Sequence, residues 1–437
     1  MPNRNLLINL IESENRKNEK YYDFLKEKFD NRFYHYGSHF KSSYEKKSTF
    51  KEALYRKIIS FLMGLFVFLM KLVKKSKGPT VISTSYFNTD SYFKTTYGFN
   101  VSRPPWAYNN NFDNLFDFNL YKKSEKIKNE LNNKNFSYLV SDTFINKIKD
   151  FEQELKIFFV TNNIVALFVS NDVGFFEKLA ISIFKDLGLP SFSFAHGLQF
   201  WLNDYDWKRT DYLVVWGMLS KQDFVNMGFN SEKVLVSGHP DHKNIKKKEL
   251  RFDVNDILVL GNSLNGINPS NEYTLTDRSN CIYYLYLIQN CLKEFNVTKV
   301  RFRPHPSENP NWYRNNIDLN FYEIDDLDLS SSLASSSLVI GPTSTVFFDA
   351  LIQGVNYVVF QPLNQFDFGL NGYRIPSMYN GDNEKVPVAK SVVELREILK
   401  KKKLVNISIL NDICQEKFDL EDVYSIINSV RTCKYDR

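Results

Sequence analysis

Several features of exported or metal-binding proteins are missing from this sequence of 437 residues. Its four cysteines, Cys281, Cys291, Cys414 and Cys433, show neither CxxC spacing nor a neighbouring histidine pair, which argues against a structural zinc site and a disulfide framework. The first residues lack the order of charged and then apolar side chains that a secretory signal has. We therefore expect a protein of the reducing cytoplasm.

The sequence also lacks a strong charge of either sign, because 56 Lys and Arg residues are set against 50 Asp and Glu residues. A net charge of +6 over this length does not require a nucleic-acid partner, and it suits an anionic small substrate or a lipid surface equally well. A hydrophobic content of 43% with 24% charged residues is typical of globular proteins. We expect no nucleic acid among its partners.

One apolar run, residues 58–73, is shorter than the roughly 20 residues that a membrane-spanning helix needs. It contains a single lysine and has basic residues on both sides. Helices that are apolar all round are usually buried, so we favour a core helix here. The basic flanks keep a second interpretation open, a helix lying on the anionic face of the inner membrane.

Short apolar segments alternate with longer amphipathic ones, the rhythm of βα units in a mostly parallel sheet. A basic, loop-like run at 243–248 interrupts this rhythm. We predict an α/β protein with two doubly wound, Rossmann-like domains, residues 1–245 and 246–437, that face a central cleft. The predicted strands are 6–10, 32–36, 80–83, 164–169, 191–194, 212–216, 234–237, 257–260, 300–302, 337–340 and 355–360.

A run of basic side chains follows a predicted strand in the second half, with the sequence Arg-Phe-Arg-Pro-His-Pro at 301–306. Prolines would hold two guanidinium groups and an imidazole at the carboxyl edge of the sheet, which is anion-binding chemistry. We expect Arg303 to face the cleft and His305 to contact a phosphate, the alternative being a capping or packing histidine. The turn after strand 257–260 adds three candidate nucleotide-binding residues: Gly261, Asn262 and Ser263.

Small hydroxyl residues follow another strand, in the sequence Gly-Pro-Thr-Ser-Thr at 341–345. Free N–H groups and hydroxyls converge where such a turn opens a helix. We expect Ser344 and Thr345 to bind a phosphate; they could also cap the helix, and both roles can hold at once. Asp349, one turn later, would either accept hydrogen bonds from ribose hydroxyls or complement the helix dipole.

The first half places carboxylates and an imidazole after strands in the same way. Asp172 follows strand 164–169, where it could act as a nucleophile or a base, or cap the next helix. Asp90 is the best second carboxylate, although turn residues of this kind are more often structural. His196, just after strand 191–194, would assist or position an acceptor, with a structural imidazole as the alternative. Two histidines and an aspartate at 239–242 are interpreted as hinge geometry and not as a metal site.

The order of these motifs resembles that of bacterial GT-B glycosyltransferases of surface-polysaccharide assembly (lipopolysaccharide O-antigen or capsule), which use CMP-activated acidic sugars. His-Gly at 196–197, Trp-Gly at 216–217, Gly-His-Pro at 238–240 and the two later blocks occur in the expected order over most of the chain. The HP and Ser/Thr motifs look like those of bacterial sialyltransferases and Kdo transferases, which implies that His305, Ser344 and Thr345 contact CMP and its phosphate. The sialyltransferase pattern of two acidic residues before glycine is absent. The layout is closer to β-Kdo transferases, whose carboxylate nucleophile would map to Asp172.

The resemblance implies a GT-B enzyme that moves Kdo, or a related nonulosonic acid, from its CMP conjugate to a glycan or lipid-linked saccharide acceptor. It would act in the cytoplasm or as a peripheral protein at the inner membrane. Because CMP leaves with its own phosphate charge, fixed cations and N–H groups can replace a metal, so we expect no metal and no other cofactor. Two alternatives stay open: a CDP-glycerol or CDP-ribitol phosphotransferase, whose motif blocks are similar, and a non-catalytic module that binds polysaccharide or tethers an assembly complex at a membrane.

Overall fold

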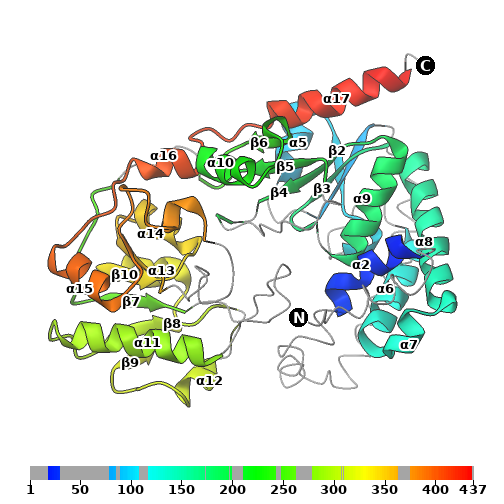
Figure 1. The fold of residues 1–437 in the computed structure, drawn as a ribbon. Helices are drawn as coiled ribbons and strands as arrows, with labels where there is room; N and C mark the ends of the chain where they lie inside the picture. The colour runs from blue at the N-terminus through cyan, green and yellow to red at the C-terminus, as the bar shows by residue number, and fades with distance from the viewer. Residues whose placement is uncertain are drawn as a thin grey trace. The chain divides into compact units, whose positions relative to one another are not determined.

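The chain forms two compact units (Figure 1). Unit 1 consists of Met1–His196, Asp206–Val214 and Leu420–Arg437, and unit 2 of Gly197–Tyr205 and Val215–Asp419. The computed structural model describes residues 18–29, 78–84, 89–107, 117–172, 174–195, 197–198, 210–242, 248–261, 278–306, 308, 310–362 and 375–435.

The first sheet has six strands in the order β2-β1-β3-β4-β5-β6, and the pairs from β2 to β5 are parallel. Its strands are β1 (Thr80–Ser83), β2 (Asn100–Ser102), β3 (Ile164–Val169), β4 (Ser191–Phe194), β5 (Tyr212–Val215) and β6 (Val234–Val236). All six residues of β3 are apolar and buried, as expected of a central strand that is covered on both faces.

Helices cover both faces of this sheet in unit 1. Leu167 and Val169 of β3 belong to the core formed with the helices that gather beside one face in Figure 1. Phe168 points to the opposite face, where its ring lies 4.8 Å from that of Phe93. The helices of unit 1 are α2 (Glu19–Phe29), α5 (Thr89–Tyr97), α6 (Phe118–Asn133), α7 (Phe136–Leu139), α8 (Asp142–Thr161), α9 (Phe175–Leu187) and α17 (Glu421–Tyr435), with a short 3-10 helix at Pro105–Ala107.

The second sheet also has six strands, in the order β12-β11-β10-β7-β8-β9, and all its pairs are parallel. Its strands are β7 (Ile257–Leu260), β8 (Val300–Arg303), β9 (Tyr322–Ile324), β10 (Leu338–Gly341), β11 (Asn356–Phe360) and β12 (Val388–Ala389). Alternate residues again face opposite sides: Ile340 joins the core with α11 and α15, whereas Tyr357 packs against Phe347 of α14. The helices of unit 2 are α10 (Met218–Asn226), α11 (Arg278–Lys293), α12 (Pro310–Arg314), α13 (Leu329–Ala334), α14 (Val346–Ile352), α15 (Val392–Lys400) and α16 (Ile409–Ile413), with 3-10 helices at Ser231–Lys233 and Ser377–Tyr379.

A late segment of the chain, residues 412–419, runs along the backbone that leaves β5 and β6. Gln415 donates its N–H to Trp216 O at 2.8 Å, and Asp419 donates its N–H to Ser237 O at the same distance. A Cβ at Gly217 would collide with the backbone of Ile413. The glycine after Trp216 is therefore explained by the close approach of two backbones.

The predicted fold class is confirmed, because the chain builds two doubly wound, Rossmann-like α/β sheets, the components of a GT-B fold. The boundary after residue 245 and the central cleft stay predictions. The strands expected at 6–10 and 32–36 lie outside the described residues.

No helix within the described ranges is long and apolar enough to cross a membrane. The apolar run at 58–73 lies outside those ranges, so both interpretations of it stay predictions.

Candidate functional site

The turn after β10 is shaped by a tyrosine from the neighbouring strand β11. A Cβ at Gly341 would collide with Tyr357 Oη, so this position has room only for glycine. The same hydroxyl donates a 2.6 Å hydrogen bond to Pro342 O. Tyr357 is fully buried, and burial raises the pKa of its phenol, which keeps the donated proton in place. The hydroxyl of Tyr357 therefore contacts both residues of the Gly-Pro sequence and explains the glycine at 341.

Two further buried side chains hold the rest of this turn. Gln361, just after β11, is 1% exposed, and its Oε1 accepts a 3.0 Å hydrogen bond from Thr343 N. Tyr379 donates its hydroxyl to Ser344 O at 3.0 Å. Three side chains distant in sequence from the turn therefore fix its backbone before any ligand arrives. Sequence reasoning missed Gln361 and Tyr379, since neither stands in a motif.

The fixed turn leaves two adjacent donors available. No residue that the structure describes accepts a hydrogen bond from the backbone N–H of Ser344 or Thr345. Ser344 Oγ accepts from Val346 N at 3.2 Å, which is the capping role, whereas Thr345 Oγ1 accepts from Leu198 N at 3.3 Å. Two adjacent N–H groups on a turn that is held in this way suit an anion.

Asp349 lies one turn into α14 with an unusual carboxyl group. Burial raises its pKa from 3.8 to about 6. No hydrogen bond joins this carboxylate to another side chain or backbone group within the described ranges. A desolvated, unpaired carboxylate beside a rigid turn is a common sign of a functional site.

The turns after β7 and β8 reach the same edge of the second sheet. Strand β7 pairs with both β10 and β8, and neighbouring strands lie about 5 Å apart. Gly261 donates its N–H to Arg303 O at 2.9 Å, which ties the two turns together. His305 is exposed, yet partial desolvation lowers the pKa of its imidazole. The candidates Asn262 and Ser263 lie outside the described residues.

Both arginines of β8 are engaged by a buried aspartate that follows β9. Arg303 Nη1 lies 3.2 Å from Asp325 Oδ2 and also donates to Leu327 O at 2.6 Å and Ser332 Oγ at 3.1 Å. Arg301, two residues earlier and hence on the same face of the strand, lies 3.8 Å from Asp325 Oδ1. The Asp325 side chain is 1% exposed. The structure therefore holds the Arg303 guanidinium at the strand end through a structural ion pair.

In unit 1, the carboxylate of Asp172 lies at the carboxyl end of β3. Asp172 is 2% exposed, and its Oδ2 lies 3.5 Å from Thr210 Oγ1, whose hydroxyl also has the carbonyl of Tyr212 as an acceptor at 3.1 Å. The N-cap residue of α9 is Gly174, so Asp172 stands two residues before the cap and does not occupy it. Of the other two candidates, Asp90 falls in the first turn of α5, and its side chain is outside the described part, as is the whole of His196.

An arginine that the sequence analysis did not select lies at the same edge of the first sheet. Arg103, just after β2, donates from Nη1 to Ser83 O at 2.9 Å. On the other side of β1, Ser170 Oγ donates to Thr84 O at 3.2 Å. A guanidinium and the Asp172 region thus flank the end of β1, as the parallel strand order requires.

The Gly-His-Pro segment of unit 2 builds an aromatic cluster beside α14. The His239 ring lies 4.4 Å from Trp216 and 4.4 Å from His242, and His242 lies 4.9 Å from Phe348. Burial, and then the neighbouring His242, lowers the pKa of His239 to about 4. The two imidazoles are therefore neutral packing groups at pH 7. No group of three potential metal ligands occurs within the described ranges.

No protein-family model matches this sequence, and no curated protein matches it. Solved structures are similar in fold. They include the UDP-GlcNAc 2-epimerase of Methanocaldococcus jannaschii, which is 13% identical over 82% of this chain and 99% of that chain, with a TM-score of 0.42. The UDP-GlcNAc 2-epimerase of Neisseria meningitidis is 11% identical over 81% of this chain and 98% of that chain, also with a TM-score of 0.42. A variant of the wall teichoic acid polymerase TagF is 13% identical over 87% of this chain and 99% of that chain, with a TM-score of 0.37. At identities and TM-scores this low, the similarities carry no argument about what this chain binds or does.

Proposed function

We propose that the protein is a glycosyltransferase that takes Kdo, or a related nonulosonic acid, from its CMP conjugate and passes it to a glycan or lipid-linked acceptor. The observation that carries the proposal is the turn at 341–345, which buried side chains hold in place and where the N–H groups of Ser344 and Thr345 donate to none of the described residues. The unpaired carboxylate of Asp349 beside it is a second, independent indication of a ligand. This carboxylate would accept hydrogen bonds from the ribose hydroxyls.

The turn would act on the leaving group. As the glycosidic bond to CMP breaks, negative charge grows on the phosphate, and donors fixed in advance stabilise that charge without reorganisation. The N–H groups of Ser344 and Thr345 would supply this stabilisation. His305, whose pKa is lowered, would donate as a neutral imidazole, and Arg303 would add positive potential from its fixed place. Under this proposal the reaction needs no metal.

Asp172 would supply the reactive carboxylate of unit 1. As a nucleophile it would form a glycosyl intermediate, and as a base it would remove the proton of the acceptor hydroxyl. Asp90 and His196 are proposed to assist it or to position the acceptor. We place the reaction at the cytoplasmic side of the inner membrane.

The test measures CMP release, with EDTA present and acceptor extract supplied, from CMP-Kdo, CMP-sialic acid, CMP-pseudaminic acid and CDP-glycerol. Two substitutions at Thr345 isolate the backbone donor. Thr345 has φ −62°, the value that proline requires, so Thr345→Pro removes its N–H with little strain. Thr345→Val removes the hydroxyl and keeps the N–H.

Turnover of one CMP-sugar, reduced about 100-fold or more by Thr345→Pro and far less by Thr345→Val, would support the proposal. Asp172→Asn should abolish the same turnover. Equal losses of turnover in the two Thr345 variants would show that the backbone N–H of Thr345 does not contribute to catalysis. Turnover of CDP-glycerol alone would show a phosphotransferase, and no turnover of any donor would favour a binding module.

A further inference from the structure

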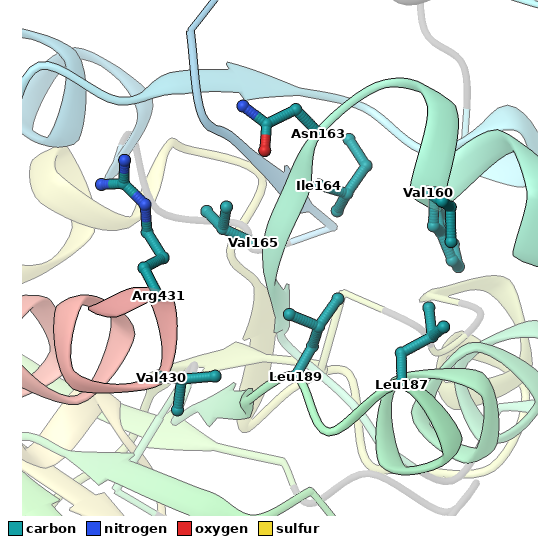
Figure 2. Close-up of a pocket in the computed structure, with 9 residues that line it drawn as sticks. Val160, Asn163, Ile164, Val165, Leu187, Leu189, Val430 and Arg431 are labelled. Carbon is teal, nitrogen blue, oxygen red and sulfur yellow. The ribbon is translucent and has the colours of Figure 1, made fainter. Parts of the chain in front are cut away.

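A pocket of about 280 Å³ opens at the amino edge of the first sheet in unit 1 (Figure 2). It lies where α8 ends, where β3 begins, before β4 and beside α17. Its lining residues are Phe159, Val160, Asn163, Ile164, Val165, Leu187, Leu189, Val430 and Arg431. The catalytic candidates of this unit lie at the other end of β3, about 20 Å away for a six-residue strand. The pocket is therefore separate from the proposed active site.

The two polar lining residues lie apart from the outer end of the pocket at α8. Figure 2 shows Arg431 at the left with Val165 and Val430 beside it, Asn163 at the top, and Val160 and Leu187 at the right. Every lining side chain except Arg431 and Asn163 is apolar. The apolar surface continues outward on α8, where Ile157 is 53% exposed and Val160 is 63% exposed. Such an arrangement fits a ligand with an apolar tail and a polar head at one end.

Arg431 makes the polar end positively charged. Its guanidinium donates to Asn428 Oδ1 at 3.3 Å and lies 5.6 Å from the Phe99 ring. Within the described ranges, no carboxylate lies at ion-pair distance from it. A cation without a carboxylate partner at the rim of an apolar pocket favours an anionic head group.

We propose that this pocket binds a single-chain amphiphile, with its hydrocarbon tail between α8 and α9 and its carboxylate or phosphate head at Arg431. The volume is just below the range of about 300–1,000 Å³ typical of drug-sized ligands and is enough for a short alkyl chain. The left-handed backbone of Asn163, φ 51°, turns the chain between α8 and β3 and places its amide at the polar side. This binding does not depend on the proposed transferase activity.

The test is calorimetric titration of the full chain with decyl phosphate and with decanoate, each below its micelle concentration. Inorganic phosphate tests the head alone, and decyl maltoside tests the tail with an uncharged head. Val430→Trp, on the partly exposed face of α17, fills the pocket. Arg431→Gln removes the charge. Arg314→Gln, which changes an exposed guanidinium of unit 2, is the matched control.

We expect both anionic amphiphiles to bind, inorganic phosphate not to bind, and Val430→Trp to abolish binding. Arg431→Gln should weaken anionic binding about fivefold, the effect of one partly exposed ion pair, and leave decyl maltoside unchanged. Binding that survives Val430→Trp, or that Arg431→Gln and Arg314→Gln change equally, would overturn the proposal, as would the absence of binding to wild type.

If Val430→Trp fails to fold, which near-ultraviolet circular dichroism would show, Val160→Glu takes its place. Val160 is largely exposed, so a charge there should not unfold the protein. It should weaken binding, because the hydrocarbon tail would have to desolvate the new carboxylate. Unchanged affinity in this variant would equally refute the proposed site.

Discussion

Replacing Asp349 by Asn should stabilise the fold at neutral pH. In the unfolded chain this carboxyl loses its proton above its usual pKa of 3.8, whereas burial delays the loss in the folded protein to about pH 6. The folded state therefore loses stability as the pH rises from about 4 to 6, and the whole cost is present above that window. An asparagine has no charge to desolvate, so it escapes this cost.

The size of the gain follows from the same pKa values. A rise from 3.8 to about 6 corresponds to about 3 kcal/mol, at ~1.4 kcal/mol for each pKa unit. Asp349 lies in the first turn of α14, where a carboxylate gains up to about 1 kcal/mol from the helix N-terminus. This gain is already contained in the folded-state pKa of about 6, so we expect a net stabilisation of up to about 3 kcal/mol at pH 8.

Urea denaturation of wild type and Asp349→Asn at pH 8 and at pH 4 checks this prediction. The variant should unfold at higher urea at pH 8, and the two proteins should unfold nearly together at pH 4. Asp326→Asn is the control, because that side chain is 73% exposed and should change stability by less than about 0.5 kcal/mol at either pH. A difference of the same size at both pH values would refute the electrostatic reasoning.

Three further predictions concern the packing of unit 2. Gly341→Ala should cost roughly 1–3 kcal/mol in urea denaturation, because its Cβ collides with Tyr357 Oη, and adding Tyr357→Phe should recover part of this loss. Gly217→Ala should lower the free energy of unfolding at least as much, because its Cβ collides with the backbone of Ile413, and no second substitution can relieve a backbone collision. An unchanged urea midpoint for Gly217→Ala would contradict the close approach of the two backbones. His239 should contribute a loss of up to about 3 kcal/mol as the pH falls from 6.5 to 4, because it then binds a proton only when unfolded, and this loss opposes the gain from Asp349 over the same pH range. In a series of thermal melts, the stability difference between wild type and His239→Phe should therefore change by about that amount between pH 6.5 and pH 4, and parallel curves would contradict the prediction.

The fold could be predicted because its central strands are continuous apolar runs in the sequence. Residues 164–169 and 338–341 are buried throughout, and both end in turn-forming or small polar residues. Edge strands carry less information. The strands β2 (Asn100–Ser102) and β12 (Val388–Ala389) are too short to show a period, and the sequence analysis missed both.

The candidate site could be predicted only as far as its motifs reach. The Gly-Pro-Thr-Ser-Thr block marked the turn after β10, but Gln361 and Tyr379, which hold it, come from other parts of the chain. The ion pair of Arg303 with Asp325 could not be predicted either, because Asp325 comes from another segment of the chain. Strand periodicity does show that Arg301 and Arg303 share a face, but which carboxylate meets them depends on the pairing of β8 with β9.

Two features of unit 2 that suit a ligand lie at one edge of its sheet. The N–H groups of Ser344 and Thr345 donate to no described residue, and Asp349 carries a desolvated charge. The desolvated charge of Asp349 costs free energy, and the tyrosines that fix the turn hold its backbone in one conformation. A phosphate at the N–H groups and hydroxyl donors at Asp349 would satisfy both features at once. If so, a ligand that provides only the phosphate should raise the pKa of Asp349 through its negative charge, whereas the hydroxyl donors of a ribose should oppose that rise.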